Sequence, residues 1–130
     1  MKREIPFQTT EPLIKVEVRL EGENKEVLFV VLALDTGATN TFISWDVAST
    51  LGYDPGKLQQ RKRIITGSGI EYAPMIKVKS ARALGVEVKD LEVLCHDLPE
   101  EAGIEGLLGL NFLETFDFCI NYSKGTIEIK

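Results

Sequence analysis

The chain of 130 residues has one histidine, two cysteines and no long block of lysine and arginine. A zinc site of the usual Cys/His kind is excluded, because Cys95 and Cys119 fit no C-x-x-C spacing and His96 stands alone. The net charge of -5 excludes a nucleic-acid surface, because the three adjacent basic residues, 61–63, are best explained as a solvated strand end. We therefore expect no metal, no other cofactor and no nucleic-acid partner.

The basic start of the chain has no apolar stretch behind it. Residues 1–6 read Met-Lys-Arg-Glu-Ile-Pro, and the residues that follow lack the hydrophobicity of a signal peptide or a membrane span. We expect a cytoplasmic protein without a membrane partner.

The two cysteines offer little chemistry. Both lie in segments of alternating apolar residues, which indicates reduced, buried packing residues rather than a disulfide. His96 follows Cys95 directly, but adjacent residues of a strand point to opposite faces of the sheet. The pair is therefore not expected to act as a thiol nucleophile with its base.

The length and the apolar pattern predict one all-β domain over residues 1–130. Short segments rich in Val, Ile, Leu and Phe alternate with Gly, Asn, Asp and Pro, and 44% of the residues are apolar. Strands are expected at 13–20, 27–34, 61–66, 70–78, 91–96, 118–122 and 126–129, and short helices at 45–51 and 112–116. The run at 27–34 predicts a strand covered on both faces, and Trp45 is expected in the core.

The triplet Asp35-Thr36-Gly37 follows the apolar strand and is the most informative segment. An ionised carboxylate at the end of a buried strand needs hydrogen bonds, and a glycine lets backbone amides turn toward it. Thr36 places a hydroxyl beside the acid. Taken alone, the triplet is equally typical of an Asx turn after a strand.

A longer frame around this triplet resembles the aspartic proteases of the retroviral type and their cellular and prokaryotic relatives. The frame consists of the strand through Leu34, then Asp35-Thr36-Gly37-Ala38-Thr39 and Phe42-Ile43-Ser44, and far downstream Gly106-Leu107-Leu108-Gly109. The resemblance covers nearly the whole chain. It implies a single-lobe, closed β-barrel of the acid-protease type with one or two short helices, working as a homodimer.

The resemblance also implies an aspartic endopeptidase. Hydrolysis by carboxylates needs two of them sharing one proton, since like charges so close cannot both ionise. Asp35 is the single aspartate here within a Thr-Gly frame; the others are Asp46, Asp54, Asp90, Asp97 and Asp117. A second chain, related by a twofold axis, is therefore expected to supply the other carboxylate.

By the same resemblance, other residues support the site. Thr36 is expected to hydrogen-bond across the twofold axis, Gly37 to keep the backbone close to the carboxylates, and Gly109 to end the second loop. Ala38 stands where pepsin-like enzymes usually carry Ser or Thr, so a less acidic working pH is expected. The hairpin tip Gly67-Ser68-Gly69 is expected to form a flap over bound peptide, although an ordinary hairpin turn explains it too.

Two other functions are compatible with an aspartate beside threonine and glycine. Phosphotransfer through an aspartyl phosphate is disfavoured, because those motifs place another residue between Asp and Thr and lie on a parallel βαβ sheet. A catalytically weak or inactive protease-like dimer, acting as a peptide-binding or dimerisation module, remains open.

Overall fold

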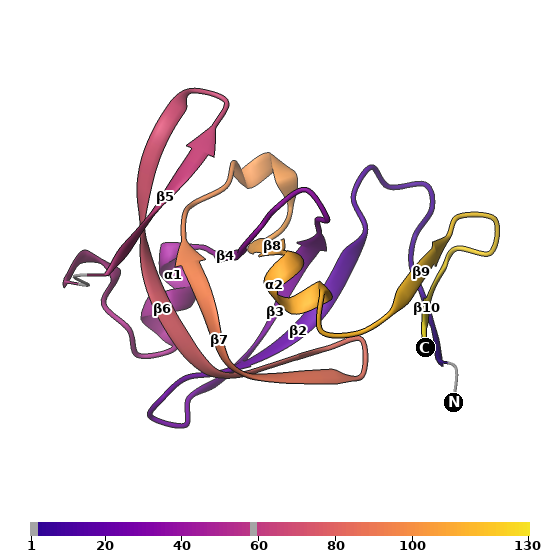
Figure 1. Cartoon of the computed structure of the whole chain (residues 1–130), viewed down its shortest axis with the longest axis horizontal. Helices are drawn as coiled ribbons and strands as arrows, with labels where there is room; N and C mark the ends of the chain where they lie inside the picture. The colour runs from indigo at the N-terminus through magenta and orange to yellow at the C-terminus, as the bar shows by residue number, and fades with distance from the viewer. Residues whose placement is uncertain (1–2, 58–59) are drawn as a thin grey trace.

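A closed β-barrel forms the body of the protein in this computed structural model, which describes residues 3–57 and 60–130 (Figure 1). Its strands are, in hydrogen-bonded order, β2 (Lys15–Glu21), β3 (Val27–Leu34), β8 (Gly106–Leu108), β4 (Thr41–Ile43), β7 (Val86–Cys95) and β6 (Gly69–Ala83). The barrel closes because β6 pairs with β2, with Leu20 opposite Ala81. The predicted all-β, closed-barrel fold is confirmed.

Two elements extend from this barrel on opposite sides (Figure 1). Strand β5 (Arg61–Thr66) pairs with the first part of β6, and the resulting hairpin projects at the upper left. On the right, β1 (Arg3–Pro6), β10 (Thr126–Ile129) and β9 (Phe118–Asn121) form a separate three-stranded sheet. Arg3 lies opposite Ile129 in this sheet, so the two ends of the described chain lie side by side.

The helices are short. They are α1 (Trp45–Thr50), α2 (Leu110–Leu113) and the 3-10 turns η1 (Pro55–Lys57) and η2 (Glu100–Ala102). Ser44 caps α1 as its sequence suggests, since its hydroxyl accepts a hydrogen bond from Val47 N at 3.1 Å. Within the described ranges, no helix has the length and apolar character needed to cross a membrane.

The second helix begins earlier than predicted. It was expected at 112–116, but it starts directly after Gly109, whose carbonyl accepts hydrogen bonds from Phe112 N and Leu113 N, both at 3.1 Å. The helix buries Phe112 and Leu113 in the barrel core. The close packing of Gly109 therefore decides where the helix begins.

Three predictions of burial are wrong. On β3, Val27 and Phe29 are 43% and 61% exposed, because the outer face of the barrel is open to solvent there. Trp45 is exposed, since α1 turns Val47 and Ala48 inward instead. Cys119 is a free, exposed thiol, because alternate residues of β9 point away from the protein.

The prediction for the other cysteine is confirmed. Cys95 is free and buried at the end of β7. Burial, together with the nearby charge of Asp97, raises the pKa of its thiol to about 11. The thiol is therefore protonated at neutral pH and unsuited to act as a nucleophile.

Candidate active site

The candidate site is built where β8 lies between β3 and β4. Strand β8 runs parallel to β3, with Leu108 beside Leu34, and antiparallel to β4, with Gly106 opposite Ile43. The loop after β3 and the chain after β8 are thereby brought together. The backbone N–H of Asp35 donates to the carbonyl of Leu108 at 3.0 Å. The place where these two segments meet is called the crossing below, and Asp35 lies at its start.

Two glycines make this crossing sterically feasible. A side chain at Gly106 would overlap the carbonyl of Phe42, and one at Gly109 would overlap the carbonyl of Asn40 and lie 2.8 Å from Ala38 O. Any other residue would force backbone apart. Gly109 thus contacts the loop that carries Asp35, and Gly106 has an equal steric role that the sequence analysis did not assign.

The carboxylate of Asp35 is oriented by its own loop. Its Oδ1 accepts a hydrogen bond from Gly37 N at 2.9 Å, and its carbonyl accepts one from Ala38 N at 3.2 Å. Asp35 is half-buried, whereas Thr36 and Gly37 are exposed at the surface of the chain. The loop leaves one side of the carboxylate open.

A buried polar network that the sequence analysis missed braces both loops. Thr41, fully buried, donates from both N and Oγ1 to Asn111 Oδ1, at 2.9 and 2.8 Å. The hydroxyl of Thr41 also accepts a hydrogen bond from Gly109 N at 3.1 Å, and Asn111 Nδ2 donates to Glu92 O at 2.7 Å. Asn111 between two apolar residues was the available signal, because a polar side chain there needs partners.

Replacing Thr41 by Val is expected to destabilise the protein by about 1–3 kcal/mol, because the buried Gly109 N–H loses its acceptor. Urea unfolding measures the change. Thr50→Val is the matched control, since the exposed Thr50 hydroxyl bonds only to Asp46 O within its own helix, and a shift within about 0.5 kcal/mol is expected. Equal losses in both variants would contradict the bracing role of Thr41.

A cavity of about 550 Å³ lies between the loop of Asp35 and the β5–β6 hairpin. Its lining residues are Asp35, Gly37, Ala38, Thr39, Asn40, Phe42, Lys62, Arg63, Ile64, Ile65, His96, Leu98 and Leu107. Among the described residues that line it, Asp35 is the one carboxylate. The described ranges also hold no cluster of three or more His, Cys, Asp or Glu side chains that could bind a metal.

The hairpin tip lies outside this lining. Gly67 and Ser68 form a two-residue turn, whereas Gly69 is the first residue of β6 and has a φ of 125° that favours glycine. All three are exposed. The predicted three-residue tip is therefore shorter, and strand β5 beneath it, rather than the tip, borders the cavity.

Comparison with known proteins identifies the family. The family model for aspartyl proteases matches residues 16–112 of the chain. Among solved structures, the chain is similar to a retropepsin-like aspartic protease from Rickettsia conorii, with a TM-score of 0.75 and 23% identity over 99% of this chain and 89% of that one. No curated protein sequence matches it. The chain belongs to the aspartyl protease family and has a fold similar to that of the retropepsin-like enzyme, and family and fold together support a protease function.

Proposed function

We propose that the protein is an aspartic endopeptidase whose active form is a homodimer, with the Asp35 carboxylates of both subunits forming one catalytic dyad. The observation that carries the proposal is the position of Asp35. It is half-buried and oriented by Gly37 N, and it lines a peptide-sized cavity in which no second carboxylate of the described chain takes part. A second copy is the simplest source of the missing acid.

The proposed chemistry is general acid–base catalysis of amide hydrolysis. The ionised Asp35 removes a proton from a water molecule, whose oxygen attacks the peptide carbonyl carbon, while the protonated Asp35 of the partner chain hydrogen-bonds the carbonyl oxygen. The tetrahedral intermediate then loses its C–N bond, and the leaving nitrogen takes a proton from the dyad. One water is consumed, and a carboxylic acid and an amine are released.

The neighbouring residues have supporting roles in this proposal. Thr36 is exposed next to Asp35, as a side chain that bonds across a twofold axis must be. Gly37 orients the carboxylate through its N–H, and Ala38 contributes no hydroxyl to it. Gly109, held by Thr41, keeps the second loop close.

The hairpin β5–β6 is the proposed flap, with Gly67, Ser68 and Gly69 at its moving end. Its strand β5 already borders the cavity through residues 62–65. All three tip residues are exposed, and a Cβ built on Gly67 or Gly69 would meet nothing within 4 Å. Closure over a bound peptide would exclude water from the dyad.

Digestion of a diverse peptide library at pH 4 to 7, followed by mass spectrometry, tests the proposed function. We expect cleavage at internal peptide bonds, since an extended peptide passes under a flap. Peptides that bind and remain intact at every pH would contradict the enzyme and favour a peptide-binding module instead.

A further inference from the structure

Two polar contacts join the β5–β6 hairpin to the barrel across the cavity. From β5, Lys62 Nζ donates to Asn40 Oδ1 at 3.1 Å. From β6, Glu71 Oε2 lies 2.9 Å from His96 Nε2. Each strand of the hairpin thus contributes a side-chain contact to the body of the protein, and three of these four residues, all but Glu71, line the cavity that contains Asp35.

The strand register explains why these side chains reach inward. Lys62 lies opposite Ala73, and Glu71 lies opposite Ile64, so the four side chains share one face of the hairpin. Ala73 is buried and Ile64 is half-buried, whereas Ile65 and Tyr72 on the other face are 79% and 65% exposed, which identifies this as the inner face. Glu71 is therefore an acidic residue on the face that covers the candidate site.

His96 is a fixed point on the barrel. Its backbone N–H donates to Ile43 O at 3.0 Å, which ties the end of β7 to β4. Its ring packs edge-on against Phe42, with centroids 6.4 Å apart and an interplanar angle of 84°. The imidazole is held by the barrel, so its contact with Glu71 attaches the hairpin to the barrel.

Several charged groups surround this imidazole. Lys62 and Arg63 of β5 and Asp35 after β3 line the same cavity. Asp97 is the next residue in the chain, and its Oδ1 accepts a hydrogen bond from Trp45 N at 3.0 Å. Glu71 is the described carboxylate whose oxygen lies within hydrogen-bond distance of His96 Nε2.

We propose that Glu71 and His96 are positioning residues: their contact holds the root of the hairpin over the cleft, and protonation of His96 strengthens that hold. The role in flap closure rests on the proposed function, whereas the restraint of the hairpin does not. Histidine changes its charge between pH 5 and 8, and the chain contains one histidine. A hydrogen bond between ions is stronger than one with a neutral partner, so the hairpin opens more often as the pH rises.

The expected size of the effect is modest. The side chains of His96 and Glu71 are 37% and 46% exposed, so solvent screens their attraction. Because local opening of a hairpin costs little free energy, even a small change in the strength of this contact alters how often the hairpin opens. We expect hairpin opening to increase about two- to five-fold between pH 5.5 and 7.5.

Hydrogen exchange of the β5 amides, measured by mass spectrometry and corrected for the intrinsic pH dependence of exchange, tests the restraint without substrate. In the parent, protection of residues 61–66 is expected to fall about two- to five-fold from pH 5.5 to 7.5. In Glu71→Gln and His96→Gln, it is expected to be low at both pH values. Unchanged protection of the barrel strands shows that each variant is folded.

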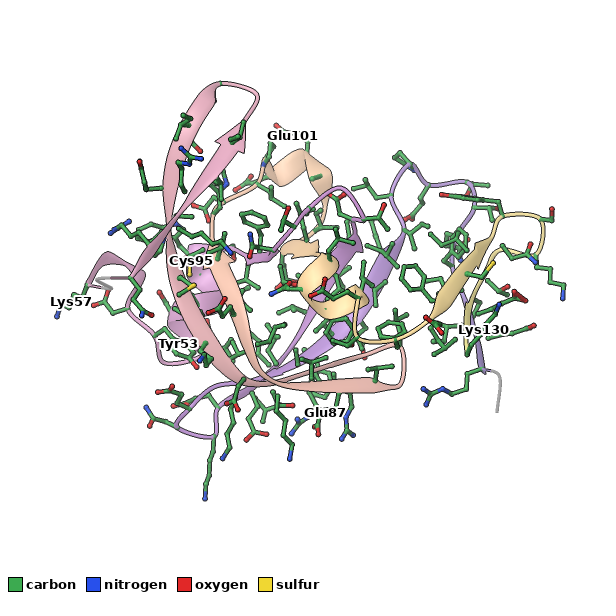
Figure 2. All side chains as sticks on the ribbon, viewed as in Figure 1. Tyr53, Lys57, Glu87, Cys95, Glu101 and Lys130 are labelled. Carbon is green, nitrogen blue, oxygen red and sulfur yellow. The ribbon has the colours of Figure 1, made fainter. Side chains whose placement is uncertain are left out.

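Glu87→Gln is the matched control. Glu87 accepts hydrogen bonds from Ser80 and Arg82 at 3.0 and 3.2 Å, and it lies at the end of the molecule away from the hairpin (Figure 2). The hydrogen bond from Ser80 and the charge of Arg82 lower its pKa, so Glu87 stays ionised at both pH values. This variant is expected to exchange as the parent does. The proposal would be overturned if protection of β5 in the parent did not change with pH. It would also be overturned if His96→Gln showed the same change with pH as the parent.

Peptide hydrolysis supplies the second measurement. Glu71→Gln is expected to raise KM about two- to five-fold at pH 5.5 and less at pH 7.5, because a weakly held flap binds peptide less well. An equal rise at both pH values would contradict the role of His96 charge. A parent that hydrolyses no peptide would contradict the proposed function alone, and the exchange experiment would still decide the role of the contact.

Discussion

Replacement of Asp35 by Asn is expected to lower kcat/KM for peptide hydrolysis by about 10³-fold or more. The amide oxygen of Asn keeps the shape of the side chain and still accepts the hydrogen bond that Gly37 N donates at 2.9 Å. It can neither take a proton from water nor hold the proton that the dyad shares. The loop is therefore expected to stay folded while the chemistry stops.

Asp54→Asn is the matched control for this variant. Asp54 makes the same local contact, because its Oδ1 accepts a hydrogen bond from Gly56 N at 3.2 Å. It does not line the cavity with Asp35. The kinetics of both variants are measured on one peptide cleaved in the library, and sedimentation confirms that both assemble as the parent does. Asp54→Asn is expected to keep the parental activity, and Asp35→Asn is expected to lose it. Parental activity of Asp35→Asn, or equal loss in both variants, would contradict the assignment of Asp35.

Replacement of Gly106 by Ala is expected to destabilise the protein by about 3 kcal/mol or more. The added Cβ would overlap the carbonyl of Phe42. Relief requires β8 to move away from β4, which breaks the pairing of Gly106 with Ile43. Leu108, which is fully buried on the same strand, would move with it.

Gly67→Ala is the control for this substitution. Nothing lies within 4 Å of a Cβ at Gly67, so we expect a change within about 0.5 kcal/mol. Urea and thermal unfolding of the two variants measure the difference. A Gly106→Ala midpoint close to that of the parent would contradict the close packing of β8 against β4.

Local sequence patterns were sufficient for the longer strands. Strand β2 alternates and β3 runs apolar over seven or eight residues, and the predicted ranges of β2, β3 and β5 agree with the structure to within about two residues. The prediction for β6 ended at residue 78, but the strand continues to Ala83 and turns at Leu84 and Gly85, with φ of 56° and 75°. Leu84 is an unusual residue for a left-handed turn, so Gly85 was the one local signal of the turn.

The short strands were missed for a different reason. Strands β4 and β8 have three residues each, and β1 has four and ends in proline. Their pairing partners lie far away in the chain, as Gly106 opposite Ile43 illustrates. A strand of this length is stable only through tertiary contacts, so its own residues carry little periodicity.

The candidate site was predicted in part. The resemblance placed Gly109 with Asp35, and the structure brings both to one crossing. The network of Thr41 and Asn111 and the contact of Glu71 with His96 join residues on different elements. Such contacts depend on strand register, which the sequence alone does not specify. The roles proposed for Thr36, Ala38 and the hairpin tip stay predictions.

Mixing the parent with Asp35→Asn subunits tests the central claim most directly, namely that two chains share one active site. At constant total protein, with subunits exchanging freely, activity is expected to follow the square of the parent fraction, because only parent–parent dimers hold two aspartates. Equal amounts should therefore give about a quarter of the parental activity. Activity that falls linearly, to about half at equal amounts, would show that each chain acts alone and would contradict the shared dyad.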